Sequence, residues 1–313
     1  MMIIHLGYVS ISKTLDITPS KTLTYTEFKK HNDFNKLDTI ITENLNNLEK
    51  IIDYNIKNNI HFYRLTSKLI PLASHKEVKF DYIKKYQKQY QKIGEKIKKY
   101  NIRVDTHPDQ FCVLNSTKKE IVENSIEILK YHYNILEALN IKNKIIILHI
   151  GSSVLGKTNS IKRFINNFNK LPNYLKECIA IENDDKIYNI KDCLNLCETL
   201  NIPMVLDYHH HICNNDNLNI DNYLTKIFNT WKNTTPKIHF SSPKNKTKKD
   251  FRSHHEYIDI LDFINFLNKL KKLNINLDIM LECKAKDEAL FKLVRLLKYY
   301  DYNFIDETTI KLK

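Results

Sequence analysis

Short runs of β-branched and other apolar residues recur along the chain, and each is followed by a longer segment whose apolar residues have helical spacing. Strands that alternate with helices in this way predict a parallel sheet, because each helix carries the chain back to the same end of the sheet. About eight such units close into a (β/α)₈ barrel, the TIM barrel. The predicted strands are Ile3 to Val9, Ile60 to Leu65, Ile102 to Thr106, Ile145 to Ile150, Ile179 to Glu182, Met204 to Tyr208, Lys237 to Phe240 and Leu277 to Glu282.

Between these strands, apolar residues three and four positions apart mark the helix faces that pack on the barrel. Such stripes run over residues 45–56, 86–97, 121–136, 161–168, 258–267 and 290–297. No linker rich in Gly, Ser or Pro interrupts the pattern, and the whole chain has only 4 glycines. We therefore expect one domain over residues 1–313, with longer connections at 214–222 and 244–252.

The chain shows no feature of a membrane or secreted protein. It has no apolar run near the ~20 residues that a membrane-spanning helix needs. Its first residues lack the basic start and apolar stretch of a signal peptide. The 6 cysteines form no disulfide-like framework, so we expect free thiols. The expectation is a cytoplasmic protein that contacts no membrane.

The formal net charge of +13 favours a polyanionic partner, because each neutralised phosphate releases condensed counterions. A composition rich in Lys and Asn would also raise the charge of many unrelated proteins. The charge therefore supports a nucleic-acid partner without establishing one.

Acidic residues and histidines gather at the carboxyl ends of the predicted strands. In a barrel these ends converge on one mouth, where the active sites of this fold lie. A single histidine there would usually be a core or surface residue, but so many imidazoles and carboxylates together need compensation, which divalent cations supply. A mixed His, Asp and Glu set suits Zn²⁺ or Mn²⁺, and its size suggests two or three ions. The set is His107, His149, Glu182, Asp207, His210, His239 and Glu282.

Lys237 is unexpected in such a mouth, because it lies two residues before His239 and so faces the same side of the strand. An ammonium group repels cations. Three interpretations stay open: the side chain points elsewhere, contacts a phosphate, or is carbamylated and becomes an anionic ligand. The choice of ligand also stays open within two groups of neighbours, His209, His210 and His211, and His254 and His255.

A series of stretches in chain order carries a recognisable pattern. They are Leu6-Gly7-Tyr8, Phe62-Tyr63-Arg64-Leu65-Thr66-Ser67 with Ile70-Pro71 and Ser74-His75, His107-Pro108-Asp109-Gln110-Phe111, Leu148-His149-Ile150-Gly151, Ile181-Glu182-Asn183-Asp184, Asp207-Tyr208-His209-His210, Lys237-Ile238-His239-Phe240-Ser241-Ser242 and Leu281-Glu282-Cys283-Lys284-Ala285-Lys286. Taken together they resemble the UV damage endonucleases, which are related in fold to endonuclease IV and more distantly to xylose-isomerase-like barrels. The resemblance covers most of the chain.

The resemblance implies metal-dependent incision of DNA immediately 5′ to UV photoproducts, chiefly cyclobutane pyrimidine dimers and 6-4 photoproducts. It implies two or three divalent ions, usually Mn²⁺, with Zn²⁺, Co²⁺ and Mg²⁺ as alternatives. It places Lys237 at the same site as a carboxylated lysine with a catalytic role, while Glu182 and Glu282 are expected to be catalytic as bridging ligands because each closes a strand that faces the same mouth. The implied ion ligands are His75, His107, His149, Glu182, Asp207, His210, His239, His254 and Glu282.

The same resemblance implies how DNA is bound. Members of the family insert a Gln-Tyr pair into the duplex, and here the pair is Gln110-Phe111. Phenylalanine keeps the flat apolar wedge but lacks the hydroxyl. Tyr8 matches a residue that stacks in the lesion site, although Ser12 stands where some members have Asn. The expected partner is double-stranded DNA containing UV lesions, bound by a monomer.

Three other functions compete with this interpretation. An abasic-site endonuclease or a sugar isomerase can use the same barrel and similar ions, since fold alone does not fix function. The positive charge and the Gln110-Phe111 pair favour DNA over a small sugar. A DNA-binding scaffold with a degenerate barrel is disfavoured, because the set of strand-end ligands is intact.

Overall fold

The computed structural model describes residues 1–31, 33–245, 247 and 249–312, and its centre is a closed barrel of parallel strands. Each strand pairs with the next, and β1 closes the ring by pairing with both β8 and β2. The predicted TIM barrel is confirmed. Its strands are β1 (Met2–Val9), β2 (Phe62–Leu65), β3 (Arg103–Thr106), β4 (Ile146–His149), β5 (Ile179–Glu182), β6 (Met204–Asp207), β7 (Lys237–Phe240) and β8 (Leu277–Leu281).

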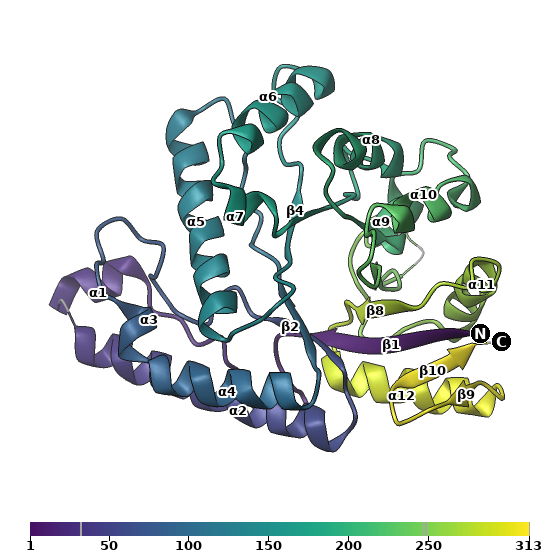
Figure 1. Ribbon diagram of the computed structural model, residues 1–313, viewed down its shortest axis with the longest axis horizontal. Coiled ribbons are helices and arrows are strands. Elements are labelled where there is room, and N and C mark those ends of the chain that lie inside the picture. The colour runs from purple at the N-terminus through teal and green to yellow at the C-terminus, as the bar shows by residue number, and fades with distance from the viewer. Residues whose placement is uncertain (32, 246, 248, 313) are drawn as a thin grey trace.

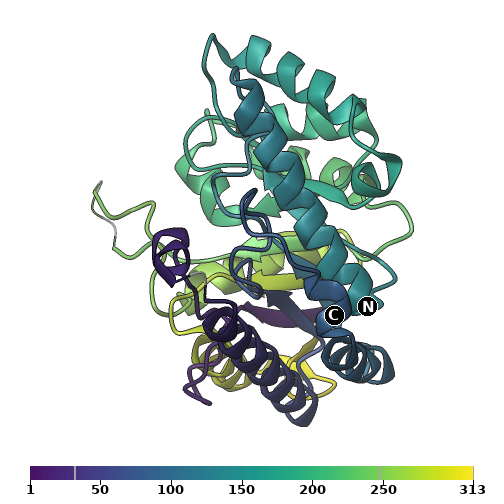
Figure 2. The same cartoon turned by 90° about the vertical axis from the view of Figure 1, so that its left-hand side faces the viewer.

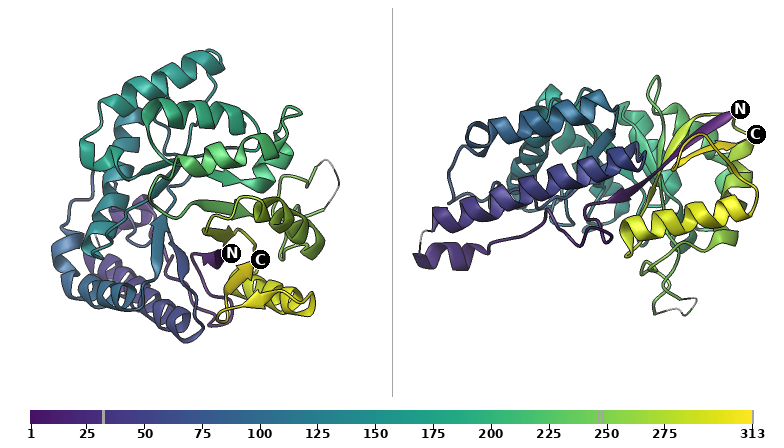
Figure 3. Two further views of the ribbon diagram at one scale, coloured as in Figure 1. Left: turned by 45° about the vertical axis from the view of Figure 1, so that its right-hand side comes forward. Right: turned by 90° about the horizontal axis from the view of Figure 1, so that it is seen from below.

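Helices surround the strands in chain order, from the purple and blue segments through teal and green to yellow (Figure 3, left). The long helices α2 and α4 run side by side, and α5 follows them around the barrel (Figures 1 and 2). Among the described helices, none is long and apolar enough to cross a membrane. The helices are α1 (Tyr25–His31), α2 (Phe34–Lys57), α3 (Tyr82–Lys85), α4 (Gln87–Lys99), α5 (Lys119–Ala138), α6 (Lys157–Asn169), α7 (Asn173–Lys176), α8 (Ile190–Leu200), α9 (Tyr208–Cys213), the 3₁₀ helix η1 (Ile220–Asn222), α10 (Leu224–Asn229), α11 (Ile260–Lys271) and α12 (Lys286–Tyr299).

The predicted helical stripes pack against the barrel with one clear exception. Leu261 is 59 % exposed, so its assignment to the core face was wrong. The reason is the phase of α11, which presents Phe263, Phe266 and Leu267 to the core instead.

Alternate side chains of the strands fill the interior of the barrel, as the two-residue repeat of a strand requires. Two small apolar clusters lie there, separate from the large core between strands and helices. One consists of Val9, Phe62 and Met280, and the other of Ile145, Ile147, Ala180, Val205 and Trp231. The same alternation continues to the carboxyl ends, where it turns His149, Glu182 and Asp207 towards the mouth.

The sequence pattern missed a hairpin near the end of the chain. Strands β9 (Asn303–Phe304) and β10 (Thr309–Leu312) pair with each other, and β10 runs antiparallel to β1 with Leu312 opposite Met2. Strand β2 pairs with β1 only from Gly7 onward, so the first half of β1 has an open edge. The hairpin covers this edge and brings both ends of the described chain together (Figures 1 and 3).

The two longer connections expected from the sequence differ in content. Residues 214–222 contain η1, while 244–252 falls partly outside the described residues, at positions 246 and 248. The described part of the second connection is fastened at its base, where Lys244 N donates to Ser253 O (2.6 Å) and Pro243 bridges His254.

Candidate metal centre

Imidazole and carboxylate atoms from separate strands meet at the mouth in two groups that share one residue. The first group is His107, His149 and Glu182, and the second is Glu182, Asp207, His239 and Glu282. Within each group, one ligand atom per residue lies within 4.8 Å of the others. The convergence expected from the strand ends is therefore present.

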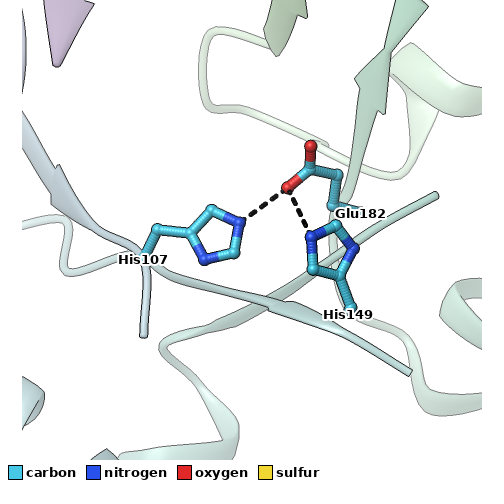
Figure 4. Close-up of side chains that lie close together, drawn as sticks. All are labelled: His107, His149 and Glu182. Atoms are coloured by element: carbon cyan, nitrogen blue, oxygen red, sulfur yellow. Dashed lines mark hydrogen bonds and ion pairs between the residues drawn. The ribbon is translucent and has the colours of Figure 1, made fainter. Parts of the chain in front are cut away.

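Glu182, the last residue of β5, links the groups through its two oxygens. Oε2 lies 2.8 Å from His107 Nε2 and 3.7 Å from His149 Nε2 (Figure 4). Oε1 lies 2.8 Å from His239 Nδ1. Burial would raise the pKa of Glu182, but its electrostatic interactions and hydrogen bonds with the imidazoles of His239, His149 and His107 hold this pKa well below its usual range. The geometry is that of a carboxylate able to bridge two ions.

The backbone fixes the orientation of His107. Its Nδ1 lies 2.8 Å from the carbonyl oxygen of Pro108, which can only accept, so Nδ1 carries the hydrogen. In the neutral ring, Nε2 then carries no hydrogen. Its lone pair faces a lone pair of Glu182 Oε2, so no hydrogen bond can form between the two atoms. A cation held by His107 and Glu182 would remove this conflict, and a backbone partner on the far nitrogen is the usual way to orient a metal-binding histidine.

Asn183 holds the ends of β5 and β6 together. Its side chain donates to the Asp207 carbonyl oxygen and accepts from the Asp207 N–H, each at 2.9 Å. Asp207 Oδ1 in turn caps α9 by accepting from His210 N (2.7 Å). The two hydrogen bonds between the Asn183 side chain and the Asp207 backbone position Asp207 beside Glu182. Burial raises the pKa of Asp207 to about 8, and its Oδ2 has no hydrogen-bond partner among the described residues.

His210 and His254 lie beside the second group. His210 Nδ1 donates to the Asn183 carbonyl oxygen (3.0 Å), which leaves Nε2 for an ion. Burial opposes the positive charge of His210, but the carboxylates of Asp207 and Glu182 outweigh it and raise its pKa to about 9. The His210 and His254 rings are 6.1 Å apart.

Contacts distinguish His210 from its neighbours. His209 contacts Cys213 Sγ (3.7 Å) and the His254 ring (5.6 Å), and His211 contacts the ring of Tyr208 (6.4 Å). Among the three consecutive histidines, only His210 has a described ion-pair contact with Glu182 and Asp207. The geometry favours His210 as the ligand of this run.

His75 is not brought to either group. Its ring stacks on Tyr25 at 4.0 Å between centroids, and its Nδ1 accepts from Glu77 N (3.3 Å). It lies in the connection between β2 and α3, which is not a strand end. A ligand role for His75 has no geometric support and stays a prediction.

The proposed DNA-binding residues fall into two classes. Gln110 and Phe111 are exposed on a turn just after His107, and the turn is anchored by the buried Cys112. Tyr8 is fully buried, and its hydroxyl donates to Asn55 Oδ1 of α2 (2.8 Å). Because its neighbour Val9 faces the barrel interior, Tyr8 faces the helices. In this structure it offers no surface to DNA.

Two charged residues, Arg64 and Asp105, lie one level below the candidate ligands in the barrel interior. The sequence pattern singled out neither of them. Arg64 of β2 donates to Glu282 Oε1 (2.6 Å) and to His239 Nε2 (2.5 Å). Its Nε lies 3.7 Å from Asp105 Oδ1, and the other Asp105 oxygen pairs with Lys237 Nζ. Lys237 therefore points into the interior, as its spacing predicted, but one level below the ligands. Burial lowers the pKa of Lys237 to about 7, against the pull of Asp105.

The donor set fits divalent ions. Neutral imidazoles suit transition metals, and burial lowers the pKa of His239 to about 4, so this ring is neutral. Asp207 Oδ2 is a buried acceptor to which no described residue donates, and carboxylates that crowd one another call for a positive charge. The residues His107, His149, Glu182, Asp207, His239 and Glu282 could hold ions without any rearrangement of the strands.

Fold and site together define a TIM-barrel protein with a candidate centre for more than one metal ion. The chain belongs to the UV-endonuclease UvdE family, whose sequence profile matches residues 4–313. A UV DNA damage endonuclease of Bacillus cereus (strain B4264) is 44 % identical over 300 residues, covering 94 % of each chain. One of Bacillus mycoides (strain KBAB4) is equally similar.

Solved structures agree with this assignment. The crystal structure of SacUVDE has a TM-score of 0.87 and 34 % identity, covering 95 % of this chain and 99 % of that one. Endonuclease IV from Thermus thermophilus has a TM-score of 0.58 at 10 % identity, covering 95 % of this chain and 98 % of that one. At this identity the second likeness shows the fold alone.

We predict that Arg64→Met destabilises the metal-free protein by about 3 kcal/mol or more, because Glu282 and Asp105 lose a buried cation. Urea unfolding of the metal-free protein measures this. Added Mn²⁺ should restore more stability to the variant than to the parent, since an ion replaces the missing charge. Arg64→Lys keeps the charge but cannot contact Glu282 and His239 at the same time. Its unfolding free energy should lie between those of the parent and Arg64→Met. Equal unfolding free energies for the parent and Arg64→Met would contradict the role of this contact.

Proposed function

We propose that the protein is a metal-dependent endonuclease that cuts DNA immediately 5′ to UV photoproducts, chiefly cyclobutane pyrimidine dimers and 6-4 photoproducts. The observation that carries this proposal is the pairing of two ligand groups, joined through Glu182, with the exposed Gln110-Phe111 turn that leaves from His107. Membership of the UvdE family supports it. All described members of both groups come from one chain, which suits a monomer.

A basic cavity beside the second group suits a phosphodiester backbone. It has a volume of about 390 Å³ and is lined by Arg252, His254, Glu282, Lys284 and Lys286, among others. Phosphate contacts by Lys and Arg position a duplex without reading its sequence. The scissile phosphate would thus be held beside Glu282, a member of the second group.

The reaction is hydrolysis of a phosphodiester bond. Water adds to phosphorus, the bond to the 3′ oxygen breaks, and the products are a 3′-hydroxyl and a 5′-phosphate. Divalent ions, of which we propose two or three and Mn²⁺ first among Zn²⁺, Co²⁺ and Mg²⁺, supply Lewis acidity and charge neutralisation for this chemistry when bound. Glu182 spans the two groups, His107 is oriented by Pro108, and Arg64 holds Glu282 in place. His210 and His254 are proposed to complete a further ion site.

Gln110 and Phe111 are proposed to enter the duplex beside the lesion. Phe111 is 68 % exposed, and the turn that carries it is fixed by Asp109 Oδ1, which accepts from Phe111 N (3.0 Å). Apolar wedges unstack base steps at a cost that is smaller where the stack is already damaged. An exposed aromatic ring this close to the ligands therefore favours distorted DNA.

A nicking assay tests the function. One oligonucleotide duplex carries a single thymine dimer, and matched duplexes are undamaged or contain an abasic site. With Mn²⁺, we expect a single cut 5′ to the dimer and none in the undamaged duplex. Cutting of the abasic duplex alone would replace the proposal with abasic-site incision.

Glu182→Gln and Glu282→Gln should each reduce incision of the dimer duplex by more than about a hundredfold, because a charged ligand is lost while the shape is kept. Bound Mn²⁺ should fall as well, and circular dichroism should show a retained fold. Glu177→Gln, an exposed residue shortly before β5, is the control and should behave like the parent. Near-normal nicking by Glu182→Gln would remove this residue from the catalytic centre.

Phe111→Ala should impair lesion-dependent cutting about tenfold or more, whereas Phe111→Tyr should remain active, because stacking of an aromatic plane is worth ~1–3 kcal/mol per base. The assay compares initial rates on the dimer duplex. If alanine at this position cuts as fast as the parent, Phe111 is not a wedge.

Lys237 is proposed to be carbamylated in the metal-loaded enzyme. The neutral amine would add to CO₂, forming an N–C bond and releasing one proton, and the product would be an anionic oxygen ligand. Lys237→Ala should then lower bound metal and incision together at unchanged DNA affinity, with native mass spectrometry showing the added carboxylate on the parent only. A variant that keeps its metal and loses DNA affinity would identify Lys237 as a phosphate contact instead.

A further inference from the structure

The connection from β4 to α6, residues 150–156, carries an exposed apolar tip. Val154 is 53 % exposed and Leu155 is 72 % exposed. Phe111 is similarly exposed on the connection from β3 to α5. Scattered exposed apolar side chains are ordinary, but tips on two adjacent connections at one end of the barrel indicate a surface that meets a partner.

Hydrogen bonds fasten these two connections to each other. The buried side chain of Asn115 donates to Ser152 O (2.6 Å) and accepts from Ser152 N (2.9 Å). Arg163 of α6 then donates to the carbonyl oxygens of Asn115 (2.9 Å) and Val154 (2.5 Å). The Val154-Leu155 tip is thus held relative to the segment that follows Phe111.

Both connections also begin at candidate ligands of the first group. Phe111 follows His107 by four residues, and Leu155 follows His149 by six. Six residues span at most about 20 Å, which equals about six base-pair steps of a duplex. Both tips therefore lie within about 20 Å of the candidate ligand from which their connection begins.

The backbone at Leu155 is strained for no packing benefit. Its φ is +65°, a left-handed conformation that branched side chains rarely adopt, and its side chain is mostly in solvent. Arg163 and Ser160 both donate to Val154 O and hold the turn in this shape. A strained turn that displays an apolar side chain fits a contact made only when a partner is bound.

The charges near the tips indicate which partner that is. Lys118 and Lys162 are exposed close to the two connections and form no ion pair with any described residue. Protein interfaces are depleted in lysine, whereas a nucleic-acid interface favours it. We propose that Val154 and Leu155 form a second contact with lesion-containing duplex DNA, packing beside Phe111 against bases that the lesion has unstacked. This inference rests on the proposed function.

The test uses Leu155→Asn in the full-length protein, because asparagine tolerates the left-handed conformation and removes only the apolar side chain. Binding is measured by fluorescence anisotropy on the dimer duplex and on the undamaged duplex, with 2-aminopurine opposite the dimer to report unstacking. We expect about tenfold weaker binding of the dimer duplex, since a leucine loses its apolar contact, and a smaller 2-aminopurine signal. The melting temperature should not fall.

Leu261→Asn is the matched control, because Leu261 is a comparably exposed leucine on α11, and it should bind like the parent. Parent-like binding and 2-aminopurine signal in Leu155→Asn would overturn the inference, as would an equal loss on the undamaged duplex. Val154→Thr, which keeps the β-branched shape, repeats the test should Leu155→Asn lose stability. If the parent binds the dimer duplex without cutting it, the proposed function fails, while the binding comparison still decides the inference.

Discussion

The opposed directions of the two Glu182 oxygens are the constraint on which the mouth depends. One oxygen faces His107 and His149, and the other faces His239. This arrangement requires the carboxylate to stand at the end of a strand whose neighbours on both sides carry candidate ligands. The closed barrel provides that position. The hydrogen bonds of Asn183 to the Asp207 backbone fix the register of β5 and β6, so that Asp207 lies at the mouth beside Glu182.

The sequence predicted the barrel well because each strand is a short apolar run bounded by polar residues. The bounds of β5 and β7 match the prediction, and the others differ by a few residues at their ends. The candidate ligands at the strand ends were predictable for the same reason: they are polar residues placed where an apolar run stops. The β9–β10 hairpin was not, since its pairing with β1 depends on an edge that only the closed structure leaves open.

What the sequence pattern left open is the face of the strand on which a residue lies. Asp105 lies two residues before His107, so strand alternation could have placed it inside the barrel. Arg64 offered no such signal, because no candidate ligand follows on β2. Tyr8 was assigned to the DNA from the family resemblance alone, and that role stays a prediction; β1 is apolar on both faces, and such a strand does not reveal which side chains point inward. The contact of Tyr8 with Asn55 shows that Tyr8 faces the helices, so Gly7 and Val9 are the positions of β1 that face the barrel interior.

Strand β3 contributes a charged or titratable side chain at every level of the barrel interior. The pairs are Arg103 with Asp278 on β8, Asp105 with Lys237 on β7, and His107 with Glu182 on β5. Removing one member of such a pair leaves the other charge buried, at a cost of about 3–5 kcal/mol. Each partner lies far along the chain on another strand. The energetic effect of a substitution in β3 therefore depends on the residue at a distant position, and the effects of changing both members of a pair do not add.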